Sequence, residues 1–256
     1  MLIINADDFG FDSNANRAIV RSFEQGLCSS TTVMANMPGF EEACCLAQQH
    51  RLVDHVGVHL VMNVGTPLTE GIKKYPRFCE RDGLLALSVS ARHFTLETSE
   101  KHVLASEIRA QISRCRANGI AITHLDSHHH LHTRWAVLAV VLAVAQSEHV
   151  PFARMAQNCG PRFTLKNDVY KCVVNFRIMS AGYSRTRYFC GLEEGQSLKE
   201  IDRITAKRKS LEVMVHPLLN EQGFVIDAGS GHPLATLINL FGSPSKAVSY
   251  SGARFS

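Results

Sequence analysis

Five of the thirteen histidines in this chain, together with an aspartate, fall within residues 123–132, whose sequence is THLDSHHHLH. This segment directly follows a short apolar run. Because alternate side chains of an extended strand point to opposite faces, His124, Asp126 and His128 should share one face. Imidazole and carboxylate groups suit zinc and other divalent metals, and a catalytic site normally uses about three protein ligands and leaves a position for water. The segment therefore predicts a metal site, with a solvated histidine-rich loop as the alternative interpretation.

Three other segments carry side chains that can bind a metal or move a proton. Residues 5–10 (NADDFG) place Asp7 and Asp8 next to each other at the end of an apolar run, and a cation would relieve the repulsion between these carboxylates. The alternative is that one of them only caps the next helix. His59 lies in a later apolar run and His216 ends the last one. Each histidine alone is more often structural, but four strands ending in such residues favour a metallohydrolase site.

The elements that must position these residues alternate between strand-like and helix-like patterns. We expect strands at 2–6, 30–35, 56–61, the histidine segment, 152–155, 186–189 and 211–215. We expect helices near 12–27, 41–49, 98–118, 134–148, 168–180, 197–209 and 234–240, with Asp12 and Thr98 as N-terminal caps. This order argues for parallel strands joined by right-handed crossovers. Residues 63–94 carry no clear pattern, and long loops of this kind often cover an active site.

Two architectures satisfy this order, an open doubly wound sheet and a closed or partly closed barrel. The polar residues fall at the C-terminal ends of the strands, where barrel enzymes assemble their sites, and this favours the barrel. We therefore predict one α/β domain over residues 1–256, a distorted or incomplete (β/α) barrel of about seven parallel strands.

Composition excludes several classes of function. The chain is 45% hydrophobic and 20% charged, with a net charge of +4. It has no long basic run interleaved with aromatics, so we expect no nucleic-acid partner. The longest apolar run covers 135–145, shorter than the roughly 20 residues of a membrane span. The N-terminus lacks the features of a signal peptide, so we expect a cytoplasmic protein. The oligomeric state stays open, a homodimer included.

Four motifs together resemble those of the YdjC-like carbohydrate deacetylases, closest to the chitooligosaccharide (chitin disaccharide) deacetylases. They are NADDFG at 5–10, GVHL at 57–60, THLDSHHHLH at 123–132 and EVMVHP at 212–217. The resemblance extends from residue 2 to about residue 217. It implies an α/β barrel related to the polysaccharide deacetylases, one divalent metal ion, and hydrolysis of an N-acetyl group on a small N-acetylated oligosaccharide, as in chitin degradation.

The same resemblance implies the roles of individual residues. By motif position Asp8, His59 and His128 would be the metal ligands, Asp7 the general base and His216 the general acid. Consecutive strand residues face opposite ways, so Asp7 and Asp8 can serve one site only if the chain already turns at Asp8. Magnesium, zinc and manganese all remain compatible with an aspartate and two histidines.

Four further residues are expected around this centre. Asp126 and Arg154 would orient Asp7 or a ligand histidine through hydrogen bonds. His130 and His132 would bind substrate or support the site, and His130 is also an alternative to His128 as a ligand.

Three functions are compatible with these features. The first is a metal-dependent deacetylase that releases acetate from chitobiose-like oligosaccharides. The second is a metallohydrolase of another substrate, such as a lipid-linked (hopanoid) sugar, and the third is a non-catalytic sugar-binding module. A binding module has no need of a positioned base, so Asp7 beside a full set of ligand candidates argues against the third.

Overall fold

The computed structural model of the chain describes residues 1–88, 94–159, 164–192, 204, 207, 209–239 and 247–253. Six parallel strands form one sheet in the order β4-β3-β2-β1-β6-β5. Their bounds are β1 Leu2–Phe9, β2 Ser30–Val33, β3 Val56–Leu60, β4 Leu125–Ser127, β5 Tyr188–Gly191 and β6 Leu211–Val215. A separate hairpin, which the sequence did not predict, joins β7 (Pro217–Leu219) to β8 (Val225–Asp227).

The sheet curls into a distorted, incomplete (β/α) barrel, as the sequence predicted. Beyond β4, two isolated parallel bridges continue the curve, one between Leu125 and Ala153 and one between Phe152 and Ser184. Ser184 lies a few residues before β5, so these bridges lead back toward the other edge of the sheet. The strand expected at 152–155 is therefore reduced to bridges, and the parallel sheet of the described residues has six strands in place of about seven.

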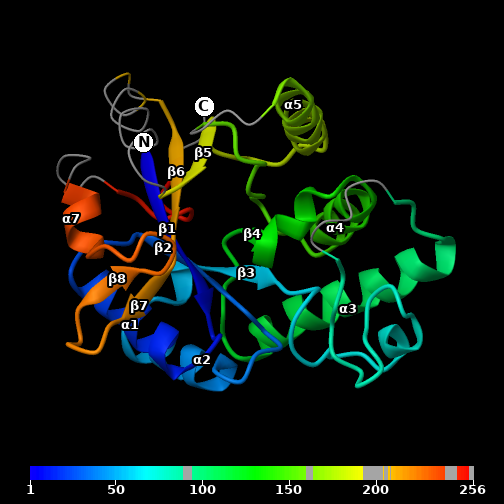
Figure 1. Ribbon diagram of the computed structural model, residues 1–256, viewed down its shortest axis with the longest axis horizontal. Helices are drawn as coiled ribbons and strands as arrows, with labels where there is room; N and C mark the ends of the chain where they lie inside the picture. The colour runs from blue at the N-terminus through cyan, green and yellow to red at the C-terminus, as the bar shows by residue number, and fades with distance from the viewer. Residues whose placement is uncertain are drawn as a thin grey trace.

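Helices cover the outside of the sheet (Figure 1). They are α1 Ser13–Glu24, α2 Phe40–Gln49, α3 Thr98–Ala117, α4 Trp135–Ser147, α5 Leu165–Ser180 and α7 Leu234–Asn239, with 3₁₀ turns η1 Val53–His55, η2 Gly71–Lys74 and η3 His128–Thr133. Asp12 caps α1 as predicted, its Oδ1 accepting from the Ala15 amide at 2.8 Å. The cap of α3 is Glu97 rather than Thr98, because Glu97 forms a reciprocal capping box with Glu100. Most of the helix expected at 197–209 lies outside the described residues.

Period-two alternation divides each strand between two environments. In β1, Leu2, Ile4 and Ala6 join the apolar core under the helices, whereas Asn5 and Asp7 hydrogen-bond within the barrel. The other strands repeat the pattern, with apolar residues outward and polar residues inward, the inward set including Thr32, His59, Asp126 and Glu212. Parallel strands are normally apolar on both faces, so this polar interior marks the site.

None of the helices in the described part of the chain has the length and apolar character that a membrane crossing requires.

Candidate metal centre and active site

The end of β1 brings two consecutive aspartates to one site. Asp8 adopts a left-handed backbone conformation with a φ of 70°, and the pairing of β1 with β2 shifts register between Ala6 and Phe9. This irregularity undoes the strand alternation, so that Asp7 and Asp8 both reach His59. The backbone thus turns at Asp8, as a shared site requires. Left-handed non-glycine residues typically cost about 1–3 kcal/mol and are often found at functional sites.

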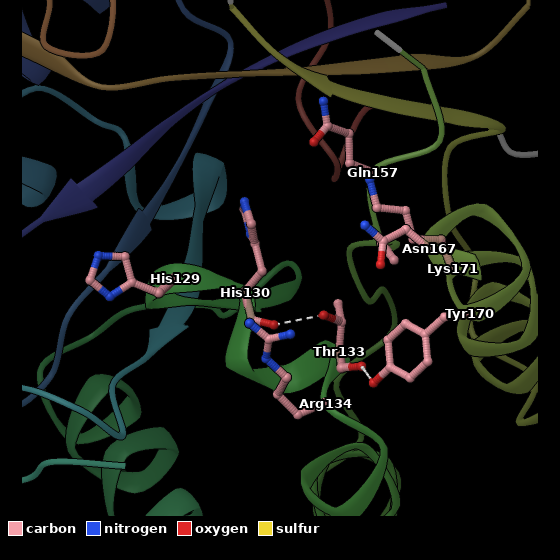
Figure 2. A pocket seen from close by; sticks show the side chains of 9 residues that line it. His129, His130, Thr133, Arg134, Gln157, Asn167, Tyr170 and Lys171 are labelled. Carbon is pink, nitrogen blue, oxygen red and sulfur yellow. Dashed lines mark hydrogen bonds between the residues drawn. The ribbon is translucent and has the colours of Figure 1, made fainter. Parts of the chain in front are cut away.

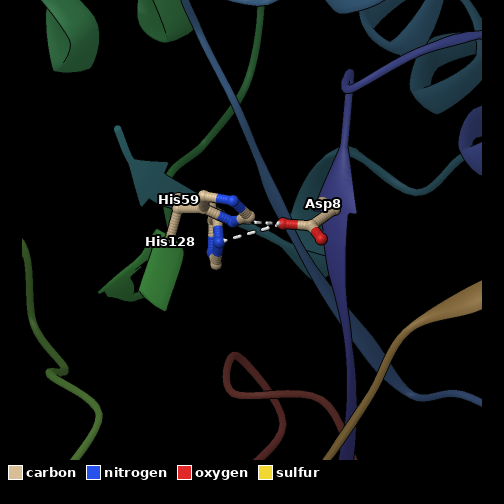
Figure 3. Close-up of side chains that lie close together, drawn as sticks. All are labelled: Asp8, His59 and His128. Carbon is tan, nitrogen blue, oxygen red and sulfur yellow. Dashed lines mark hydrogen bonds and ion pairs between the residues drawn. The ribbon is translucent and has the colours of Figure 1, made fainter. Parts of the chain in front are cut away.

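Asp8, His59 and His128 meet at the C-terminal ends of β1, β3 and β4 (Figure 3). Their candidate ligand atoms all lie within 4.8 Å of one another. Asp8 Oδ1 is 3.2 Å from His59 Nε2 and 3.0 Å from His128 Nδ1. One carboxylate oxygen and two imidazole nitrogens from three separate strand ends make a compact donor set.

The environment of His59 shows that this set fits a cation. His59 Nδ1 lies 2.7 Å from Asp126 Oδ1, and since a carboxylate only accepts, the imidazole donates from Nδ1. In the neutral ring Nε2 then carries a lone pair. In this neutral form the buried atom has no hydrogen-bond partner, and it faces the oxygen of Asp8. Two electron-rich atoms at this separation require a proton or a cation between them, and the donor set suits a divalent metal.

In the absence of metal, a proton satisfies the contact between His59 Nε2 and Asp8 Oδ1. Burial lowers the pKa of His59, but the charge of Asp126 and the hydrogen bonds to Asp126 and Asp8 outweigh burial and raise that pKa to about 10. Burial raises the pKa of Asp8, yet the hydrogen bonds to His128 and His59 hold it far below its usual range. Metal binding would therefore release a proton from His59, which couples metal affinity to pH.

Behind Asp8, His59 and His128, the buried guanidinium of Arg154 binds several carboxylates. Arg154 donates from Nη1 to Asp7 Oδ2 at 2.6 Å and from Nη2 to Asp7 Oδ1 at 2.7 Å. Its Nη1 also lies 2.5 Å from Asp126 Oδ2, and its Nε donates to Glu212 Oε1 at 2.7 Å. Bidentate pairing fixes the orientation of Asp7. Arg154 and Asp126 therefore lie directly behind Asp7 and His59, respectively.

Sequence reasoning missed several residues of this network. Glu212 accepts from Arg154 and also from the Tyr250 hydroxyl, whose oxygen is 2.5 Å from Glu212 Oε2. Asn5 donates to Asp7 Oδ1 at 2.8 Å. Two of these residues could have been found from the sequence. Glu212 is charged inside the apolar run 211–215, and Asn5 is polar inside the first strand. Tyr250 gave none, because it lies in a polar segment after the last predicted helix.

The remaining predicted residues lie around the centre but outside the ligand set. His132 is buried between Ser127 Oγ, 2.7 Å from its Nδ1, and the Arg154 carbonyl oxygen, 3.1 Å from its Nε2. His130 is left-handed, with a φ of 55°, and its ring contacts Phe189 edge-on. Neither ring belongs to a metal-competent group among the described residues.

His216 lies at the end of β6, where its backbone amide donates to Asp227 Oδ1 at 2.9 Å. Its imidazole makes no hydrogen bond or ion pair with Asp7 or Asp8 in the described part of the chain. It lies near enough to His129, in the histidine turn η3, to influence it electrostatically. The pKa of His129 is lowered by burial and then by neighbouring charges, and His216 is one of them.

Comparisons with known proteins agree with this geometry. Residues 1–236 match the model of the YdjC-like protein family. A carbohydrate deacetylase of Geobacillus stearothermophilus is 32% identical over 84% of this chain and 78% of its own length. A chitooligosaccharide deacetylase of Yersinia pestis is 31% identical over 99% of this chain and 96% of its own.

The fold has a solved counterpart in Enterococcus faecalis V583, a protein named as a candidate for cellobiose-phosphate cleavage. It superposes with a TM-score of 0.68 and 21% identity, covering 94% of this chain and 90% of that one. At this identity the likeness concerns the fold alone. The family match over most of the chain, with relatives at about a third identity, shows that this chain belongs to the YdjC-like family.

Proposed function

We propose that this chain is an enzyme that hydrolyses the N-acetyl group of small N-acetylated oligosaccharides, chitobiose-like in size, and releases acetate. The observation that carries the proposal is the convergence of Asp8, His59 and His128 beside Asp7. The names of the relatives, carbohydrate deacetylase and chitooligosaccharide deacetylase, agree with it. A cytoplasmic location is part of the proposal, and cell fractionation tests it.

Asp8, His59 and His128 would hold one divalent ion, magnesium or zinc. Such an ion polarises a carbonyl oxygen and lowers the pKa of water from about 15.7 toward about 7. By accepting from Nδ1, Asp126 would keep the His59 lone pair available to the ion. In the proposed reaction these residues position the acetyl group, and the hydrolysis itself depends on proton transfers by other side chains.

Asp7 would take the proton from the attacking water. Arg154 binds both oxygens of this carboxylate and Asn5 also donates to Oδ1, which holds the group in place and leaves a further lone pair on Oδ2. Fixed orientation is what a general base needs, and such catalysis typically contributes about 10²–10⁴-fold. His216, from the end of β6, would donate the proton that lets the amine leave.

Variants of His216 and His128 test these assignments. With N,N′-diacetylchitobiose as substrate, His216→Ala should keep the metal content of the wild type and lose about 10²-fold or more in kcat, since only proton donation is removed. His128→Ala should lose both metal and turnover. Acetate release and elemental analysis of the purified proteins provide the two readouts.

The controls separate this proposal from its competitors. His50→Ala, at the exposed end of α2, should match the wild type in both measurements. Full activity of His216→Ala would exclude it as the acid. Metal-dependent turnover restricted to lipid-linked substrates would overturn the oligosaccharide assignment, and sugar binding without turnover by any metal-loaded sample would overturn the enzymatic one.

A further inference from the structure

A cavity of about 230 Å³ lies between the histidine turn η3 and helix α5 (Figure 2). Two lining residues, His129 and His130, directly follow the candidate ligand His128, and the ring centroids of His128 and His129 are 4.0 Å apart. The cavity is lined by His129, His130, Thr133, Arg134, Ala156, Gln157, Asn167, Tyr170 and Lys171. A substrate held at the metal cluster would therefore have this cavity as its neighbour.

Helix α5 supplies one wall through its inward face. Asn167, Tyr170 and Lys171 precede the fully buried Val174 and Ile178 at helical spacing, so the same face that anchors the helix also reaches the cavity. The opposite face of α5 is exposed. This arrangement makes the inward polar residues part of the fold rather than of a mobile surface.

Tyr170 fixes the position of that wall. Its hydroxyl donates to the Thr133 carbonyl oxygen at 3.0 Å and accepts from the Trp135 amide at 3.0 Å. Thr133 in turn donates from Oγ1 to the His130 carbonyl oxygen at 2.7 Å. The cavity is thus preformed, with α5 tied to the end of η3 and the start of α4.

The lining groups have the chemistry of a saccharide site. Gln157 and Asn167 each present an amide, which both donates and accepts, and sugar hydroxyls do the same. Arg134 and Lys171 add donors, and none of the described lining residues is a carboxylate, which argues against a cation as the ligand. His130 adds a buried Nδ1 that has no hydrogen-bond partner. A buried polar atom of this kind is costly unless a ligand or water pairs with it.

The backbone of the histidine turn η3 adopts a strained conformation. His129 and His130 are both left-handed, with φ values of 53° and 55°. Two consecutive non-glycine residues in this region cost about 1–3 kcal/mol each and persist where the surroundings determine them. Here the turn places His128 at the metal cluster and His130 at the cavity.

We propose that this cavity binds the sugar ring adjacent to the one that is deacetylated, with Gln157, Asn167 and His130 as its hydrogen-bonding partners. Its volume is below the about 300–1,000 Å³ of pockets for drug-sized ligands, so it holds one ring rather than a long chain. The proposal rests on the proposed function and deepens it. In this proposal, residues on α5 and in the segment after Phe152 set the preference for a disaccharide over a monosaccharide.

Single variants Gln157→Ala and Asn167→Ala test the proposal through selectivity. We measure kcat/KM for acetate release from N,N′-diacetylchitobiose and from N-acetylglucosamine. Each variant should reduce the ratio of the two about 3- to 10-fold, mainly through a higher KM for the disaccharide, because an uncharged hydrogen bond is lost. Gln146→Ala, an exposed glutamine on α4, is the matched control and should keep the ratio of the wild type. An unchanged ratio in both cavity variants would overturn the proposal.

A direct binding experiment separates this proposal from the proposed function. Calorimetric titration of the wild type with the glucosamine disaccharide and with glucosamine should show tighter binding of the disaccharide, and Asn167→Ala should lose about 3- to 10-fold of that preference. If the wild type releases no acetate from either sugar, the proposed function is wrong. This titration still tests whether the cavity binds the second sugar ring. Equal binding of the two sugars by the wild type would overturn the subsite.

Discussion

His59, a proposed metal ligand, is hydrogen-bonded to a residue outside the proposed ligand set. Asp126 holds its Nδ1 at 2.7 Å and is itself held by Arg154. Asp126→Asn should weaken metal affinity about 10- to 100-fold, because a neutral amide binds the imidazole less strongly and also allows the wrong tautomer. Titration of the metal-free proteins with Zn²⁺ measures this. Asp12→Asn, in which asparagine caps α1 equally well, is the control and should bind like the wild type.

An undiminished zinc affinity in Asp126→Asn would show that the Asp126 contact is structural only.

His124 predicts an acid-sensitive fold. It is buried, with its Nε2 3.1 Å from Asn5 Oδ1 and its ring stacked on Tyr250. Burial first of all lowers the pKa of His124 to about 3, below the ordinary value of 6.5. Between these two values the unfolded chain binds more protons, so stability is lost as pH falls. From pH 7 to pH 5 this one residue should remove about 2 kcal/mol from the free energy of unfolding.

Urea unfolding at pH 7 and at pH 5 measures this loss. The loss should be smaller by this amount in His124→Gln than in the wild type, whatever the stability of the variant at pH 7. A variant that keeps the full pH dependence would assign the effect to other groups.

At the scale of single elements, β3 depends on one glycine. A Cβ built on Gly57 would lie 2.5 Å from His124 Nδ1 and 2.6 Å from the His124 carbonyl oxygen. Gly57→Ala should therefore lower the free energy of unfolding by about 1–3 kcal/mol, because β3 and the segment before β4 must move apart. Gly71→Ala is a suitable control, since the nearest atom to its Cβ is 3.9 Å away. Equal stability of the two variants would contradict the close approach.

The sequence predicted most of the elements and a gathering of polar side chains at one C-terminal edge of parallel strands, and it supplied the three ligand candidates through the resemblance of its motifs to the family. It did not predict how Asp7 and Asp8 share a site. That depends on a left-handed backbone at Asp8, and nothing in the residue type requires it. Likewise the run 152–155 reads as a strand, but only two of its residues form bridges. The local sequence pattern does not specify the strand tilt and stagger with which a barrel closes.

At the scale of the whole molecule, Tyr250 ties a late segment to the barrel interior. Its hydroxyl donates to Glu212 Oε2 at 2.5 Å. Tyr250→Phe should lower the free energy of unfolding by about 1–3 kcal/mol, because a buried carboxylate oxygen loses a partner. Tyr183→Phe, which removes a hydrogen bond to the neutral carbonyl of Leu142, should cost less. Denaturant unfolding compares them, and a smaller loss in Tyr250→Phe would contradict the role of this contact.

The same segment also pairs with the first strand, since Ala247 bridges Leu2 and the Val248 amide donates to the Leu2 carbonyl oxygen. The two halves of this contact are therefore far apart in the order of translation. Until residues 247–250 have been made, Glu212 lacks its tyrosine and β1 lacks this neighbour. The nascent protein can assemble its strands early, but its buried charges become fully paired only after residue 250 has left the exit tunnel.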